Sequence, residues 1–185
     1  MLEIRWHSRA GQGAVTGAKG LADVVSTTGK EVQAFAFYGS AKRGAAMTAY
    51  NRVDDKPIMN HEKFMHPDFV FVIDPALVYT ADITAYDKPE TVYIITTHLS
   101  SDELVASQPK LEGKKLYTVD CIKIAQETIG RAIPNTPMLG AFMKISNMYD
   151  IEFFKENMQR VLEKLPQKII DANMQAIQRA YDEVK

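Results

Sequence analysis

The fold is decided by one stretch near the N-terminus, Leu2-Glu3-Ile4-Arg5-Trp6-His7-Ser8-Arg9-Ala10-Gly11-Gln12-Gly13. Apolar and polar residues alternate through its first half, which is the pattern of a β-strand. Apolar residues then recur at helical spacing from about Ala14 to Thr27, which predicts an α-helix. The glycine-containing segment between them is therefore a turn that connects a strand to a helix.

This turn is a candidate anion-binding site. The first backbone N–H groups of a helix have no partner inside the helix, and with the helix dipole they favour a negative group such as a phosphate. Arg9 adds a positive charge, and the two glycines allow a sharp turn and a close approach. The predicted binding residues are Arg9, Ala10, Gly11, Gln12 and Gly13. A tight turn without a ligand stays open as the alternative. Thr16 replaces the third glycine of the dinucleotide-binding pattern, and no Gly-Lys-Ser/Thr of the Walker type follows.

The composition limits the class of protein. The chain has 185 residues, of which 46% are hydrophobic and 24% charged, and its net charge is -1, so nothing indicates a nucleic-acid partner. The single cysteine, Cys121, excludes an internal disulfide and cannot by itself hold an iron–sulfur cluster or a structural zinc ion. No signal peptide or membrane-spanning stretch is visible, so we expect a cytoplasmic protein without a membrane partner.

The rest of the chain predicts one α/β domain over residues 1–185. We expect a Rossmann-like, mostly parallel sheet with flanking helices and a helical C-terminal end. A strand–helix–strand unit fills the first forty residues, and a turn at 54–57 suggests that an antiparallel pair extends one edge. Further strands are expected at 32–37, 47–53, 69–73, 92–96 and 115–119, and helices at 14–27, 122–129, 138–145, 151–164 and 167–183.

No catalytic residue and no metal site can be assigned from the pattern. His7 precedes the first turn, and we favour a hydrogen-bonded strand histidine over a catalytic or phosphate-binding one. Asp74 and Asp120 follow predicted parallel strands, where ligand crevices form, and we favour helix capping over a bond to a ribose. The other histidines show no spacing that suggests a metal site.

A second glycine-containing segment, residues 38–44 after the second predicted strand, combines an aromatic residue with basic residues. Aromatic residues and arginine are favoured in protein interfaces, so we predict that this edge docks against another chain. An ordered surface loop is the alternative. The predicted interface residues are Tyr38, Gly39, Lys42, Arg43 and Gly44.

The motifs taken together resemble a known family. They are Glu3-Ile4-Arg5-Trp6-His7 with Arg9-Ala10-Gly11-Gln12-Gly13, then Gln33-Ala34-Phe35, Tyr38-Gly39, Arg43-Gly44-Ala45, Asn51-Arg52, Val72-Ile73-Asp74, Ile133-Pro134-Asn135-Thr136-Pro137-Met138-Leu139-Gly140-Ala141 and Ile170-Asp171-Ala172-Asn173. In this order they resemble the gamma subunit of pyruvate:ferredoxin oxidoreductase (pyruvate synthase), within the 2-oxoacid:acceptor oxidoreductases. The chain departs from the family's common pattern at Ser8, where glycine is usual, and at Ser40-Ala41-Lys42, where relatives commonly carry an acidic residue.

The resemblance implies a subunit of an enzyme complex. Such complexes decarboxylate pyruvate or a related 2-oxoacid, for example phenylglyoxylate, release an acyl-CoA and reduce ferredoxin. It implies that alpha, beta and delta subunits are partners and that thiamine diphosphate, Mg and [4Fe-4S] clusters lie in those partners. This chain would be non-catalytic alone, and its first turn would hold part of coenzyme A. The alternative is a free-standing nucleotide-binding α/β oxidoreductase, which requires an intact glycine fingerprint and an acidic residue at the end of the second strand.

Overall fold

A computed structural model describes residues 1–38 and 44–185 of the chain, and its centre is a six-stranded sheet in the order β2-β3-β1-β4-β5-β6. β1, β4, β5 and β6 run parallel, whereas β3 is antiparallel to both of its neighbours, β1 and β2. The strands are β1 (Leu2–Arg9), β2 (Glu31–Tyr38), β3 (Ala46–Asp54), β4 (Phe69–Val72), β5 (Val92–Thr96) and β6 (Lys115–Val119). The predicted α/β class with a mostly parallel sheet is confirmed.

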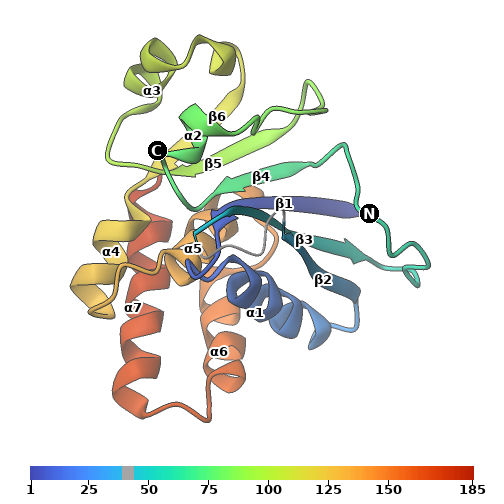
Figure 1. Ribbon diagram of the computed structural model, residues 1–185. Helices are drawn as coiled ribbons and strands as arrows, with labels where there is room; N and C mark the ends of the chain where they lie inside the picture. The colour runs from blue at the N-terminus through green and yellow to red at the C-terminus, as the bar shows by residue number, and fades with distance from the viewer. Residues whose placement is uncertain (39–43) are drawn as a thin grey trace.

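Helices cover the two faces of the sheet unequally (Figure 1). The larger core lies on the face that α1 and the C-terminal helices cover, and a smaller core lies between β4, β5 and the short helices α2 and α3. The predicted helical C-terminal end is confirmed. The helices are α1 (Ala14–Ser26), α2 (Leu77–Thr80), α3 (Ser101–Ser107), α4 (Cys121–Thr128), α5 (Asn135–Ser146), α6 (Ile151–Val161) and α7 (Gln167–Glu183), with a 3₁₀ turn η1 (Pro109–Leu111).

The side chains of β1 divide between these two faces. Ile4 and Trp6 are fully buried in the larger core. The indole N–H of Trp6 donates to Asn51 Oδ1 at 2.8 Å, and the Asn51 amide donates to the Ala18 carbonyl at 2.8 Å, which ties β1 and β3 to α1. The alternate residues of β1 point to the opposite face, because successive side chains of a strand point in opposite directions.

The position of β3 differs from the expected topology. β1 and β2 run in the same direction, as a strand–helix–strand unit requires, but β3 lies between them and pairs with both. The expected antiparallel pair does extend one edge of the sheet, but its strands are β2 and β3, and the chain continues irregularly from the turn at 54–57 to β4. The physical reason is that alternate residues of β3, such as Met47, Ala49 and Val53, belong to the core under α1. Residues 49–53 of β3 are moreover all buried, so both of its faces are covered, whereas no residue of β2 is buried and β2 forms the edge.

The fifth helix begins earlier than its sequence pattern indicates. The expected start at Met138 is wrong, since the helix runs from Asn135 and Pro134 occupies the cap position. Inside it, Gly140 faces α7 so closely that a Cβ atom there would lie 2.0 Å from the Ile177 carbonyl oxygen. The capping role expected of Asp120 is confirmed at α4, and Ser100 forms a capping box at α3.

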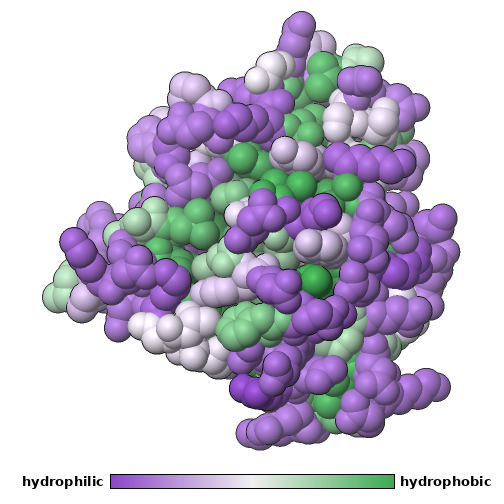
Figure 2. Space-filling view, turned by 180° about the vertical axis from the view of Figure 1, so that it is seen from behind, coloured by the Kyte–Doolittle hydropathy of each residue, from purple (hydrophilic) through white to green (hydrophobic). Residues whose placement is uncertain are grey.

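The surface is mixed in character. On the side seen from behind, hydrophilic residues cover most of the molecule and apolar residues gather near its middle (Figure 2). Two large exposed apolar side chains, Phe37 and Tyr38, adjoin each other at the end of β2, with exposed fractions of 46% and 62%. Among the helices of residues 1–38 and 44–185, none is long and apolar enough to span a membrane.

Candidate anion-binding site at the end of β1

The first turn has the backbone geometry that its glycines predict. Gly11 and Gly13 adopt φ angles of +100° and +88°, in the left-handed region that residues with a side chain rarely occupy. A Cβ atom on Gly13 would also lie 3.0 Å from the side chains of Asn135 and Ile133, because the start of α5 packs against the turn. Glycine is therefore required at position 13 by both conformation and space.

The helix start beside this turn is open. Gly13 is the cap residue of α1, so no side chain caps the first N–H groups, and the first turn of α1 holds no acidic residue. A hollow of about 210 Å³ lies there, lined by Gly11, Gly13, Ala14, Val15, Thr16, Tyr38 and Met47. Uncapped N–H groups at the positive end of a 13-residue helix that face a hollow are suited to an anion.

The side chains of Arg9 and Gln12 are held by Asp74, which follows β4, the strand parallel to β1. Arg9 Nε forms an ion pair with Asp74 Oδ2 at 3.0 Å, and Gln12 Nε2 donates to the same oxygen at 2.8 Å. Gln12 Oε1 in turn accepts from the backbone N–H of Arg9 at 2.8 Å, and Arg9 Nη1 donates to the Gly44 carbonyl at 3.2 Å. The positive charge that Arg9 adds beside the turn is therefore paired, and its part in binding a ligand stays a prediction. The pair with Asp74 largely neutralises that charge and makes Arg9 part of the turn's support.

Asp74 has a role that its sequence position only partly indicates. Its Oδ1 accepts from the backbone N–H of Ala76 at 2.9 Å, at the approach to α2, which agrees in kind with the capping interpretation. Its Oδ2 supports the first turn, and this second role was missed. The expected parallel sheet could have indicated this role, because the carboxyl ends of the parallel neighbours β1 and β4 meet at one edge of the sheet.

His7 contradicts the interpretation favoured from the sequence. Its side chain is buried, with 8% of the residue exposed, and Nε2 has no hydrogen-bond partner among the described residues. Burial, reinforced by the charge of Arg5, lowers the pKa of His7 to about 3, so the imidazole is neutral at neutral pH. Among the described residues Nε2 thus departs from the favoured hydrogen-bonded strand histidine, and the ring lines a cavity on the sheet face opposite α1.

Only part of the predicted interface lies within the described residues. Tyr38 is 62% exposed at the end of β2, and Gly44 adopts φ +79° before β3. Gly39, Lys42 and Arg43 lie outside the described residues. The exposed aromatic character at this corner agrees with the expectation, while the docking itself stays a prediction.

The chain matches a family model over residues 3–183, and that model describes pyruvate ferredoxin/flavodoxin oxidoreductase. The chain belongs to this family. Members of the family with full-length similarity include the common subunit gamma of the pyruvate/ketoisovalerate oxidoreductases of Pyrococcus furiosus, with 40% identity over 100% of this chain and 98% of that one. The full-length match agrees with the order of motifs along the sequence.

Solved structures support the family assignment. The crystal structure of the pyruvate oxidoreductase subunit PorC from Thermotoga maritima has 37% sequence identity, covers 100% of this chain and 97% of that one, and gives a TM-score of 0.84. A 2-oxoglutarate:ferredoxin oxidoreductase from Magnetococcus marinus, with 2-oxoglutarate, coenzyme A and succinyl-CoA bound, shares the fold at 18% identity and a TM-score of 0.77. This chain covers 98% of its own length but 30% of that longer chain.

The described part of the chain offers no metal site. No group of three or more histidine, cysteine, aspartate or glutamate side chains in residues 1–38 and 44–185 lies close enough to hold a metal ion. Cys121 is fully buried, and burial raises the pKa of its thiol.

Proposed function

We propose that this chain is the gamma subunit of a 2-oxoacid:ferredoxin oxidoreductase and that the open start of α1 binds an anionic part of coenzyme A. The observation that carries the proposal is the full-length similarity to gamma subunits and to PorC, at 40% and 37% identity. The chain's own residues suit a binding role, because one cysteine cannot hold an iron–sulfur cluster. Thiamine diphosphate, magnesium and the clusters then belong to the alpha, beta and delta subunits, which also pass electrons to ferredoxin.

The anion assignment is supported by the helix start rather than by Arg9. Coenzyme A carries a pyrophosphate and a further phosphate, and a helix N-terminus with uncapped N–H groups is a suitable partner for such groups. Gly11 and Gly13 allow close approach of the backbone, and the bonds of Asp74 to Arg9 and Gln12 hold the turn in place before any ligand arrives. A binding site that is formed in advance loses less conformational entropy when its ligand binds.

The alternative of a free-standing nucleotide-binding oxidoreductase is disfavoured by the sheet. In the dinucleotide-binding fold, an acidic residue at the end of the second strand contacts the ribose. Here the second strand ends at Tyr38 and is separated from β1 by β3. The family match over residues 3–183 points to the same conclusion.

The anion site is tested by a charge placed in the helix start. Thr16 is exposed and lies at the third position of α1, where a glutamate is favourable to the helix. We expect Thr16→Glu in the purified complex to raise the half-saturating concentration of coenzyme A at least about tenfold, which corresponds to roughly 1.4 kcal/mol. Thr16→Gln, which has the same size and no charge, is the matched control and is expected to change it less than threefold.

The two parts of the proposal fail separately. Unchanged dependence on coenzyme A in the Thr16→Glu complex would remove the helix start from the coenzyme site and leave the subunit assignment standing. The subunit assignment is tested by native purification: the chain should co-elute with other oxidoreductase subunits, and the isolated chain should not turn over pyruvate with coenzyme A and ferredoxin. Turnover by the isolated chain, or purification as a lone species, would overturn it.

A further inference from the structure

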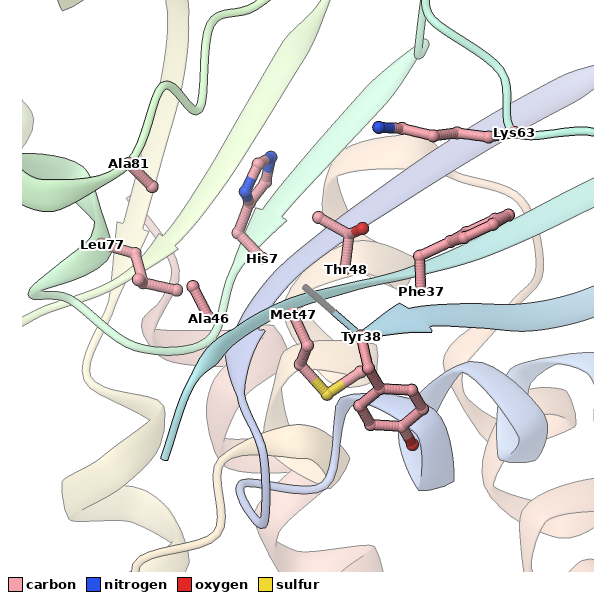
Figure 3. A pocket seen from close by; sticks show the side chains of 9 residues that line it. All are labelled: His7, Phe37, Tyr38, Ala46, Met47, Thr48, Lys63, Leu77 and Ala81. Carbon is pink, nitrogen blue, oxygen red and sulfur yellow. The ribbon is translucent and has the colours of Figure 1, made fainter. Parts of the chain in front are cut away.

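The second face of the sheet holds a cavity that the coenzyme proposal does not use. Its volume is about 310 Å³, which lies at the lower end of the range for small-molecule pockets. Figure 3 shows the side chains of His7 and Thr48 pointing to this face, whereas Tyr38 and Met47 point to the opposite one. Leu77 and Ala81 border the His7 side of the cavity, Phe37 borders the β2 side, and Lys63 reaches over it from the segment before β4.

The floor of this cavity contains an unsatisfied polar group. His7 is buried, and its Nε2 has no hydrogen-bond partner among the described residues. An unsatisfied buried polar group costs about 1–3 kcal/mol, and native proteins contain few of them. The imidazole lines the cavity (Figure 3), so a ligand there contacts the ring, while Nε2 itself is shielded from the cavity.

The charges around His7 are mostly positive. Arg5, Lys63 and Lys110 lower the pKa of the imidazole, and Asp82 alone among its main charged neighbours raises it. Lys63 is exposed and forms no ion pair with a described residue. A cavity with this surplus of positive charge favours a negatively charged occupant.

We propose that the His7 cavity binds a small organic carboxylate with a compact apolar body. The carboxylate is placed at the Lys63 ammonium and the Thr48 hydroxyl, where a charge-assisted hydrogen bond is available. The apolar body packs against Phe37, Leu77 and Ala81, and the neutral His7 ring forms part of the floor. The cavity adjoins the hollow at the start of α1, because Tyr38 and Met47 line both, whereas His7, Lys63 and Leu77 line the His7 cavity alone.

Benzoate and benzamide are suitable probes, since they share size and shape and only benzoate is charged. The full-length chain, labelled with ¹⁵N-histidine, is titrated with each compound and followed by NMR of the His7 ring nitrogens. We expect saturable binding of benzoate in the millimolar range with a shift of the His7 resonances. Benzamide is expected to bind at least fivefold more weakly.

Two conservative variants locate the carboxylate. Lys63→Met removes the charge from an exposed side chain and is expected to weaken benzoate at least fivefold without changing benzamide. Thr48→Val keeps the shape of the side chain and should weaken benzoate about twofold or more. Lys123→Met is the matched control, because Lys123 is an exposed lysine on α4, away from the cavity. The proposal is overturned if benzoate does not saturate, if both compounds bind equally, or if Lys123→Met weakens benzoate as much as Lys63→Met.

Discussion

The close contact between α5 and α7 predicts that the substitution Gly140→Ala destabilises the fold. The new Cβ would lie 2.0 Å from the Ile177 carbonyl oxygen and 2.8 Å from its carbon, whereas ordinary contacts begin near 3.4 Å. These neighbours are backbone atoms, so no side chain can rotate out of the way and the helices must separate by more than an ångström.

Two opposing effects decide the size of the loss. Alanine is favoured over glycine inside a helix by about 1 kcal/mol. Overpacking of a core typically costs about 1–3 kcal/mol, and a clash with backbone lies at or above the upper end. We therefore expect the free energy of unfolding to fall by about 3 kcal/mol at the melting temperature, which for a chain of this length lowers Tm by roughly 6–12 °C.

Gly20→Ala is the matched control for this prediction. Gly20 also lies inside a helix, but a Cβ there would meet only the end of the Met158 side chain, with Cε at 3.5 Å and Sδ at 3.9 Å, and these are ordinary contacts with a flexible side chain. This variant should gain the helix preference and raise Tm by a few degrees. Thermal unfolding followed by circular dichroism measures both variants. A Gly140→Ala protein within about 0.5 kcal/mol of the wild type would refute the reasoning from the helix crossing.

Three further predictions follow from single side chains. Asp74→Asn removes the carboxylate that binds Arg9 and Gln12. Because the ion pair is partly exposed, we expect the free energy of unfolding in urea to fall by about 1–2 kcal/mol. An unchanged urea midpoint would contradict the role of Asp74 in supporting the turn. The pKa of His7 falls from 6.5 to about 3 on folding, so between these pH values only the unfolded chain binds this proton. The free energy of unfolding of the wild type relative to that of His7→Gln should therefore be constant above pH 6.5 and decrease below it by up to about 1.4 kcal/mol per pH unit. If the stabilities of the two proteins instead change with pH in parallel, the assignment is refuted. Cys121 is fully buried and its thiol pKa is raised, so iodoacetamide should alkylate the native chain at least about a hundredfold more slowly than the chain in urea, and equal rates would contradict its burial.

The elements that follow local patterns could be predicted from the sequence. Alternation in β1, helical spacing in α1 and the continuous apolar run of β4 each depend on residues close in the chain, and all three elements form where expected. The cap residues Ser100 and Asp120 also act through neighbours two or three positions away. Such features can be predicted from the sequence because the interacting residues lie in the same short segment.

The features that were missed depend on partners distant in the sequence. Arg9 and Asp74 are 65 residues apart, and the pair exists only because β1 and β4 are neighbours in the sheet. The insertion of β3 between β1 and β2 likewise depends on which residues the core under α1 accepts. Within the described part of the chain His7 Nε2 has no hydrogen-bond partner, and no sequence pattern indicates such an unpaired atom.

The pair between Arg9 and Asp74 changes how the anion site attracts its ligand. An arginine that faced the hollow would supply a full positive charge, and its loss would weaken binding directly. Arg9 instead supports the turn, so its removal would leave the Asp74 carboxylate unpaired beside the candidate site and add repulsion to any loss of order. A defect in an Arg9 variant would thus mix two effects. A charge introduced at Thr16 acts on the helix start while the bonds among Arg9, Gln12 and Asp74 stay intact, and for this reason it distinguishes a ligand site from a structural turn.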